Sequence, residues 1–182
     1  MEFQRLAIPD VILVRPKVFG DDRGFFLESW ERRKFAAAGI DADFVQDNHS
    51  RSSRNTLRGL HYQLSQPQGK LVRVVSGSVL DVAVDIRRSS PTFGRSVVAE
   101  LDDRNRHMLW VPPGFAHGFV VRSESADFLY KCTDYYAPHS ERCIRWDDPE
   151  LAIDWGLPAG TLPLLSAKDA NGVSLRDAEY FP

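Results

Sequence analysis

The stretch Lys70–Arg87, KLVRVVSGSVLDVAVDIR, carries the clearest structural signal in the chain. Two runs rich in β-branched residues flank Ser76-Gly77-Ser78, a short turn sequence that favours a β-hairpin. The second run alternates small or acidic residues with large apolar ones, namely Asp81, Ala83 and Asp85 against Val82, Val84 and Ile86. Because successive side chains of a strand point to opposite sides, one face should pack in a core, and the other should be polar or line a barrel interior.

Further short strands are predicted on both sides of this stretch. Runs typical of strands occur at residues 10–19, 95–101, 107–112, 118–123 and 126–136, with Gly, Pro and Asp turns between them. Pro16 divides the first run, which suits an edge strand or a strand pair. Regular short strands of this kind indicate a sandwich or barrel. No repeat or linker interrupts the pattern, so residues 1–182 are expected to form one all-β domain.

Helix signals are few. Residues 29–40, SWERRKFAAAGI, predict one helix with Ser29 as its N-cap and Gly39 just beyond its C-terminal end. Residues 147–155, DDPELAIDW, predict one short helical turn with Pro149 near its start. The expected fold is therefore a β-barrel with a few short helices.

Composition excludes several classes of protein. The net charge of −2 lacks the basic excess of a nucleic-acid binder, and no apolar run reaches the ~18 residues of a membrane span. Cys132 and Cys143 show no CxxC spacing, which argues against a disulfide framework or a structural zinc site. The N-terminal residues do not read as a secretory signal. We therefore expect a soluble, cytoplasmic protein with no nucleic-acid or membrane partner.

Two histidines stand in informative contexts. His117 lies in VPPGFAHGF (111–119), where Pro112, Gly114 and His117 match the second motif of the cupins, which are jelly-roll barrels. Metal-binding cupins carry H-x-H with a following Glu in their first motif, because side chains two apart on a strand reach one ion. Here His61 of LRGLHYQ (57–63) is followed at that spacing by Gln63, and no Glu appears in 64–70. The ligand set expected of a metal-binding cupin is therefore incomplete in this sequence.

An imidazole without a metal can act as a general base near neutral pH, better so when a carboxylate orients it. Lys70 could stabilise an oxyanion, and Tyr130 could return a proton. A base, a cation and a phenol together suit proton abstraction next to a carbonyl group. Taken singly, each of these residues could equally be an ordinary packed or hydrogen-bonded side chain.

Six segments in collinear order closely resemble the dTDP-4-dehydrorhamnose 3,5-epimerases, which are metal-free, cupin-like enzymes. The segments are FGDDRGFFLESW (19–30), NTLRGLHYQ (55–63), QGKLVRVVSGSVLDVAVDIRRSSPTFG (68–94), VPPGFAHGF (111–119), DDPELAIDW (147–155) and LSAKDA (165–170). The resemblance runs from about Asp10 to Asp169. It implies a cupin-type jelly roll that inverts C3 and C5 of dTDP-4-dehydro-6-deoxy-D-glucose by acid–base catalysis, with no cofactor.

The resemblance also assigns roles by position. His61 becomes the proton acceptor with Asp169 as its partner, Tyr130 the proton donor and Lys70 the stabiliser of the enolate. Further positions fall on ligand contacts: Arg23, Glu28, Gln46, Asn48, Arg58, His117, Glu141 and Lys168. Arginine suits a diphosphate because its guanidinium fork matches phosphate oxygens. The resemblance implies a homodimer with exchanged N-terminal strands, in which Arg23 reaches the neighbour's site.

Three alternatives stay open at this point. Relatives in deoxysugar pathways epimerise C3 only or C5 only. A metal-dependent cupin oxygenase or isomerase would need the missing ligands, and a non-catalytic sugar-nucleotide binder would need neither acid nor base.

One local geometry is also open. On a regular strand Arg58 and His61 point to opposite faces. Either a bulge at Gly59 turns Arg58 inward, or Arg58 serves the phosphate end from the strand's entrance. The second arrangement is the expected one.

Overall fold

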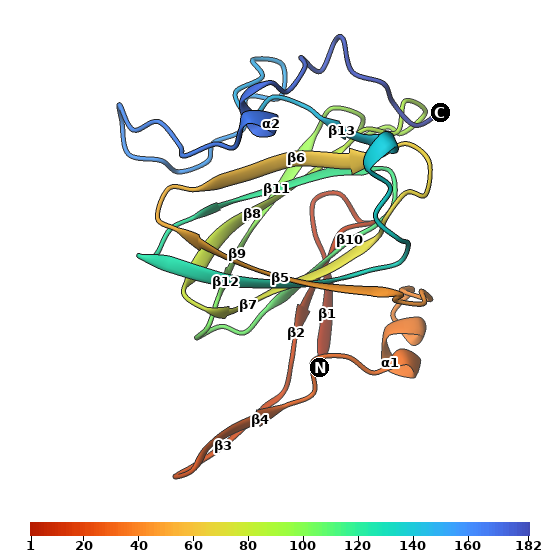
Figure 1. Cartoon of the computed structure of the whole chain (residues 1–182). Helices are drawn as coiled ribbons and strands as arrows, with labels where there is room; N and C mark the ends of the chain where they lie inside the picture. The colour runs from red at the N-terminus through yellow and green to blue at the C-terminus, as the bar shows by residue number, and fades with distance from the viewer.

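The computed structural model describes residues 1–182, in which β-strands dominate and helices are short (Figure 1). The strands are β1 Glu2–Arg5, β2 Ile12–Arg15, β3 Val18–Asp21, β4 Gly24–Leu27, β5 Gln46–Ser53, β6 Leu57–Gln63, β7 Lys70–Ser76, β8 Ser78–Asp85, β9 Ser96–Asp102, β10 Met108–Val111, β11 Phe115–Val121, β12 Ser125–Cys132 and β13 Glu141–Cys143. The helices are α1 Arg32–Ala37, the 3₁₀ turn η1 Pro138–Ser140 and α2 Ala167–Ala170. The predicted all-β class is confirmed.

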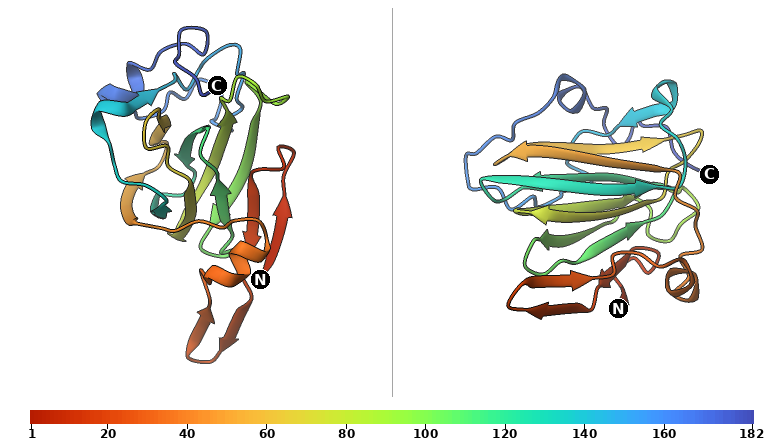
Figure 2. Two further views of the ribbon diagram at one scale, coloured as in Figure 1. Left: turned by 90° about the vertical axis from the view of Figure 1, so that its right-hand side faces the viewer. Right: turned by 60° about the horizontal axis from the view of Figure 1, so that its bottom comes forward.

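Two antiparallel sheets face each other (Figure 2). One has the strand order β1-β2-β10-β7-β12-β5, and the other has the order β13-β6-β11-β8-β9. A core of 17 buried residues, including Val72, Ala83, Phe119 and Phe128, packs between them. A second core, which includes Trp155, packs the outer face of the β6-β11-β8 layer against the C-terminal segment.

The predicted hairpin at residues 76–78 is wrong. β7 and β8 do not pair; they belong to opposite sheets, and the chain crosses from one to the other at Gly77. Gly77 has φ +79°, and a Cβ there would lie 2.0 Å from the carbonyl oxygen of Ser125. Glycine is needed at such a position because it alone takes this conformation without steric cost. A tight hairpin turn would also favour glycine at this position, so the residue type alone does not distinguish a hairpin from a crossing between sheets.

The alternation predicted for residues 81–86 is present, but both faces of β8 are buried. Ala83 packs in the core between the sheets, and Asp81 and Asp85 are fully enclosed. Val82 and Val84 pack in the second core, under the C-terminal segment. Asp81 therefore faces the barrel interior, as the alternation predicts for a polar or lumen-facing side of this strand.

The first helix begins later than expected. Its N-cap is Glu31, whose carboxylate accepts hydrogen bonds from the backbone N–H groups of Arg33 and Lys34, and not Ser29. Gly39 follows the C-cap residue Ala38, as predicted. Residues 147–155 form a turn closed by the hydrogen bond from the Ala152 N–H to the Asp148 carbonyl. Neither α-helix is long and apolar enough to cross a membrane.

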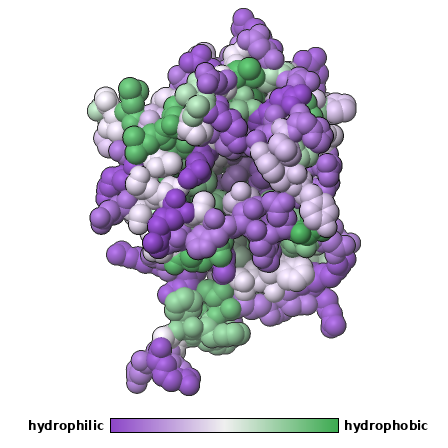
Figure 3. Space-filling view, in the orientation of Figure 1, coloured by the Kyte–Doolittle hydropathy of each residue, from purple (hydrophilic) through white to green (hydrophobic).

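The paired strands β3 and β4 project from the body of the molecule (Figures 1 and 2). Phe19, Phe25 and Phe26 on this projection are 53%, 59% and 69% exposed. Apolar side chains accordingly gather near its base, and its tip is hydrophilic (Figure 3). A projection with so many exposed aromatic rings is typical of a surface that a partner covers.

Candidate active site

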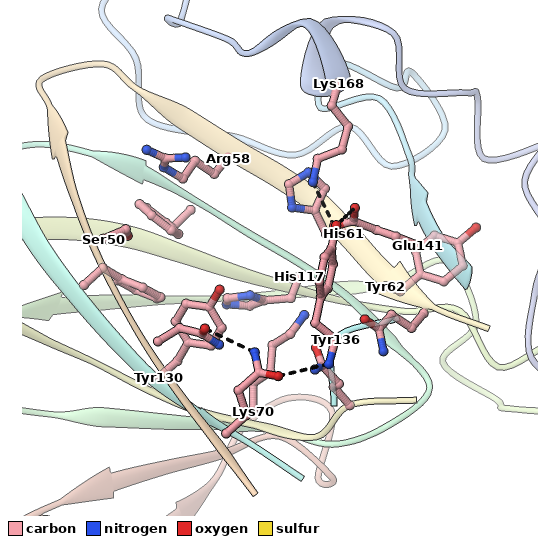
Figure 4. Close-up of a pocket in the computed structure, with 16 residues that line it drawn as sticks. Ser50, Arg58, His61, Tyr62, Lys70, His117, Tyr130, Tyr136, Glu141 and Lys168 are labelled. Atoms are coloured by element: carbon pink, nitrogen blue, oxygen red, sulfur yellow. Dashed lines mark hydrogen bonds and ion pairs between the residues drawn. The ribbon is translucent and has the colours of Figure 1, made fainter. Parts of the chain in front are cut away.

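A cavity of about 380 Å³ lies between the two sheets. It brings together most of the predicted site residues: Gln46, Asn48, Arg58, His61, Lys70, His117, Tyr130, Glu141 and Lys168. They come from both sheets and from α2, and their side chains converge on one space (Figure 4). Asp169 lies directly behind this wall, in contact with His61.

His61 and Asp169 form a dyad. The Nε2 atom of His61 is 2.7 Å from Oδ1 of Asp169, although the ring does not aim Nε2–H along the hydrogen-bond direction. Asp169 is held in place by hydrogen bonds from the Gly59 N–H and from the hydroxyl of Ser166, the N-cap of α2. Nδ1 of His61 makes no hydrogen bond within the chain, so one ring nitrogen lies against the carboxylate and the other is free to accept a proton.

The charge of Asp169 is secured by its surroundings. Burial alone would raise the pKa of this carboxyl, but the contacts from His61, Ser166 and Gly59 outweigh burial and hold the pKa well below its usual range. The carboxylate is therefore negative at neutral pH. A negative neighbour stabilises the imidazolium that forms when His61 takes up a proton.

Tyr130 projects into the cavity from β12, in the sheet opposite to the one that holds His61 (Figure 4). Burial raises the pKa of its phenol above the ordinary value, so the group stays protonated at neutral pH. A ligand seated between the sheets would meet an imidazole on one side and a phenol on the other. This is the geometry that an exchange of protons between two faces of one carbon requires.

Lys70 stands at the start of β7 and lines the cavity, and its ammonium makes no ion pair or hydrogen bond within the chain. Burial lowers the pKa of its ammonium below the ordinary value of 10.5, and the nearby Cys132, Glu141 and Asp81 oppose this effect. An unpartnered cation that faces a cavity is a ready donor for a developing oxyanion.

Arg58 reaches the same cavity as His61, so the expectation that it serves the site only from the strand's entrance is wrong. The pairing of β6 with β11 shifts register, with His117 opposite His61 but Phe119 opposite Arg58. This is a bulge, and it reverses the alternation of β6 at Gly59. A Cβ at Gly59 would lie 2.5 Å from the Cα of Gly118, which explains the glycine. Arg58 bonds Ser52 through Nε and leaves its terminal nitrogens free.

Arg23 and Glu28 do not join the cavity of their own chain. Arg23 sits at the tip of the β3–β4 projection, where it pairs with Asp21 and its side chain is 90% exposed. Glu28 pairs with Lys34 of α1. Sequence position alone could not reveal this separation, because it depends on the direction in which the projection leaves the body.

Sequence reasoning missed two residues of the site. Asp81, fully buried on β8, accepts a hydrogen bond at 2.9 Å from Nε2 of His117, which lines the cavity, so a second carboxylate–imidazole pair lies beside the site. The lumen-facing alternation of residues 81–86 was the available signal. Tyr136 also lines the cavity, and its hydroxyl donates to Glu141.

The residues best placed to hold a metal are His61, Cys143 and Asp169, whose ligand atoms lie within 4.8 Å of one another. Both carboxylate oxygens of Asp169 already accept hydrogen bonds. Gln63, at the former metal position of the cupin motif, uses its amide on the backbone of residues 66, 135 and 137. The chemistry of these side chains fits the acid–base dyad better than a ligand set.

A β-barrel of two facing sheets, with a His–Asp dyad and a half-buried phenol on opposite walls, defines a cupin-like acid–base isomerase. The family model for dTDP-4-dehydrorhamnose 3,5-epimerase matches residues 5–177. A Pseudomonas aeruginosa protein named dTDP-4-dehydrorhamnose 3,5-epimerase is 61% identical over 183 residues, covering 100% of both chains. The chain belongs to the dTDP-4-dehydrorhamnose 3,5-epimerase family.

Solved structures agree with this membership. An epimerase from Legionella pneumophila in complex with dTDP-4-keto-L-rhamnose superposes with a TM-score of 0.94 at 50% identity, covering 98% of this chain and 94% of that one. A 3′-monoepimerase from Streptomyces bikiniensis in complex with dTDP-quinovose gives a TM-score of 0.87 at 33% identity, covering 94% and 86%. The fold is therefore shared by enzymes that differ in the number of carbons inverted.

Proposed function

We propose that the protein inverts both C3 and C5 of dTDP-4-dehydro-6-deoxy-D-glucose to give dTDP-4-dehydro-L-rhamnose, without a cofactor. The observation that carries the proposal is the His61–Asp169 dyad on one wall of the cavity and Tyr130 on the other. Both carbons flank the C4 ketone, so one enolate-stabilising cation can serve both exchanges. The 61% identity to a 3,5-epimerase supports double inversion over the alternative of a single one.

In the proposed mechanism His61 removes the proton from the carbon next to the ketone, and Asp169 stabilises the resulting imidazolium. Lys70 holds the negative charge on O4 of the enolate. Tyr130 then gives a proton to the opposite face of the same carbon, which inverts it. Repetition at the second carbon completes the reaction. The free terminal nitrogens of Arg58 suit the diphosphate.

The product identifies the function. Purified protein and substrate should give a sugar whose NMR couplings report inversion at both C3 and C5. A product inverted at one carbon would assign the protein to the single-carbon epimerases, and no product with ligand still bound would leave a sugar-nucleotide binder. Activity unchanged by a chelator, with no metal found by elemental analysis, would exclude the metal-dependent alternative.

Replacing Asp169 with asparagine should lower kcat by about 10- to 100-fold, because the amide stabilises the imidazolium poorly. The KM should change little, because Asp169 lies behind His61 and not against the ligand. Steady-state kinetics check this expectation. Asp154→Asn is the matched control, since it makes the same substitution at an exposed carboxylate outside the cavity and should leave kcat unchanged. Unchanged kcat in Asp169→Asn would contradict the dyad.

The dependence of kcat/KM on pH should reflect the ionisation of the Lys70 ammonium. Its ammonium is charged below its pKa and neutral above, and burial lowers that pKa from 10.5. The enolate therefore loses its cation, and kcat/KM falls, at a pH below 10.5. In Lys70→Arg the guanidinium keeps its charge, so this alkaline limb should move to higher pH even if activity is lower. An identical alkaline limb in both proteins would remove Lys70 from this role.

We further propose a homodimer in which each β3–β4 projection supplies Arg23 and Glu28 to the neighbour's cavity, and a cytoplasmic location. The exposed Phe19, Phe25 and Phe26 support a partner at the projection. Co-expression of Arg23→Ala with His61→Asn chains is the sharp test. Each variant alone should be nearly inactive, and mixed dimers should regain activity because one of their two sites holds both native residues. No regain in verified mixed dimers would contradict the exchange.

A further inference from the structure

Residues 133–137, here called the strap, connect β12 to η1 at the mouth of the cavity. The strap belongs to no strand or helix, so its backbone groups need other partners. Tyr136, the fourth of its five residues, lines the cavity together with His61 (Figure 4).

Three glutamine side chains hold the backbone of the strap. Gln68 donates to the carbonyl of Asp134 at 2.8 Å. Gln63 donates to the carbonyl of Tyr135 at 3.2 Å and accepts from the N–H of Ala137 at 3.0 Å. Gln46 accepts from the N–H of Tyr136 at 3.0 Å. All three glutamines line the cavity, so the strap is tied from inside the site.

The ties come from both sheets. Gln46 lies on β5 and Gln63 on β6, and these strands belong to opposite sheets. The strap therefore bridges the open side between them. Its Tyr136 hydroxyl donates to Glu141 at 3.0 Å, and Glu141 accepts from Lys168 of α2 at 2.8 Å. One continuous set of contacts runs from the strap to the helix that carries Asp169.

Gln63 is the most enclosed of the three glutamines. The residue is 5% exposed, and both atoms of its amide are used, with a further bond to the carbonyl of Gln66 at 2.8 Å. Loss of this amide would leave the Tyr135 carbonyl and the Ala137 N–H of the strap without these partners. Such a loss favours a strap that moves away from the mouth.

We propose that Gln63 is a positioning residue that keeps the strap over the cavity, and that the strap retains the singly inverted sugar until the second inversion. This inference rests on the proposed double epimerisation. After the first inversion the bound sugar can either leave or undergo the second proton exchange. A closed mouth slows departure and leaves the chemical steps unchanged.

The test compares Gln63→Leu with wild type at low conversion, with NMR analysis of every sugar released. The variant should release singly inverted sugar together with the doubly inverted product, and its KM should rise by about tenfold, as expected for one or two lost hydrogen bonds. Gln4→Leu is the matched control, because it makes the same substitution at an exposed glutamine of β1 that lies outside the cavity. The control should release the doubly inverted sugar alone.

A Gln63→Leu protein that releases only doubly inverted sugar would overturn the inference, whatever its rate, since misfolding lowers the amount of active enzyme but not the product ratio. If that variant does not fold, Gln68→Leu loosens the same strap at a less enclosed position and should shift the ratio in the same direction. Wild-type protein that never produces the doubly inverted sugar would instead overturn the proposed function.

Discussion

His61→Asn should lower kcat by about 10²- to 10⁴-fold, the range that a positioned general base contributes. Asparagine fills a similar volume next to Asp169 but cannot accept a proton. Both inversions should be lost together, because the proposal gives one imidazole the removal of the protons at C3 and at C5. The measurement is the rate at which solvent deuterium enters the sugar, followed alongside product formation.

The control for this variant is His139→Asn, which changes an exposed histidine outside the cavity. It should keep wild-type exchange at both carbons. If His61→Asn exchanged either proton at the wild-type rate, another base would be at work for that carbon. His117 with its partner Asp81 would then be the group to test next, because it lines the same cavity.

Tyr130→Phe should separate proton removal from inversion. The ring and its packing beside Phe128 remain, with ring centroids 6.0 Å apart, and only the hydroxyl is lost. His61 can still form the enolate, but no acid stands on the opposite face. The proton then returns from the side on which it left. Deuterium should enter recovered substrate with its original configuration, and product formation should fall by about 10²- to 10⁴-fold.

Tyr135→Phe provides the comparison, since its phenol is exposed and lies outside the cavity. Mass spectrometry of recovered substrate and NMR of product from one D₂O reaction give both rates. Inversion at the wild-type rate in Tyr130→Phe would remove the phenol from the donor role. Loss of exchange as well as inversion would mean that Tyr130 is needed to form the enolate, and not only to end it.

The sequence predicted the all-β class and the inward face of β8 because alternation is a local property. It also named His61, Lys70 and Tyr130, which the fold brings to one cavity. These residues were reached through collinear motifs, each of which is weak alone. The order of several motifs along the chain indicates where each residue lies in the fold, which the type of a single residue does not indicate.

What the sequence could not predict depends on contacts between distant segments. The crossing at Gly77 and a hairpin ask for the same residue, so only the pairing partners distinguish them. The inward turn of Arg58 depends on the register of β6 against β11. The bond from His117 to Asp81 likewise joins neighbouring strands that are 36 positions apart in the chain.

The central claim is that two walls of one cavity exchange protons with the carbons on either side of a ketone. It is tested most directly by running the wild-type reaction in D₂O and locating deuterium in the doubly inverted product by NMR. The account predicts one deuterium at C3 and one at C5, because each inversion delivers a proton that equilibrates with solvent. A product that retains its original hydrogen at both carbons would contradict it.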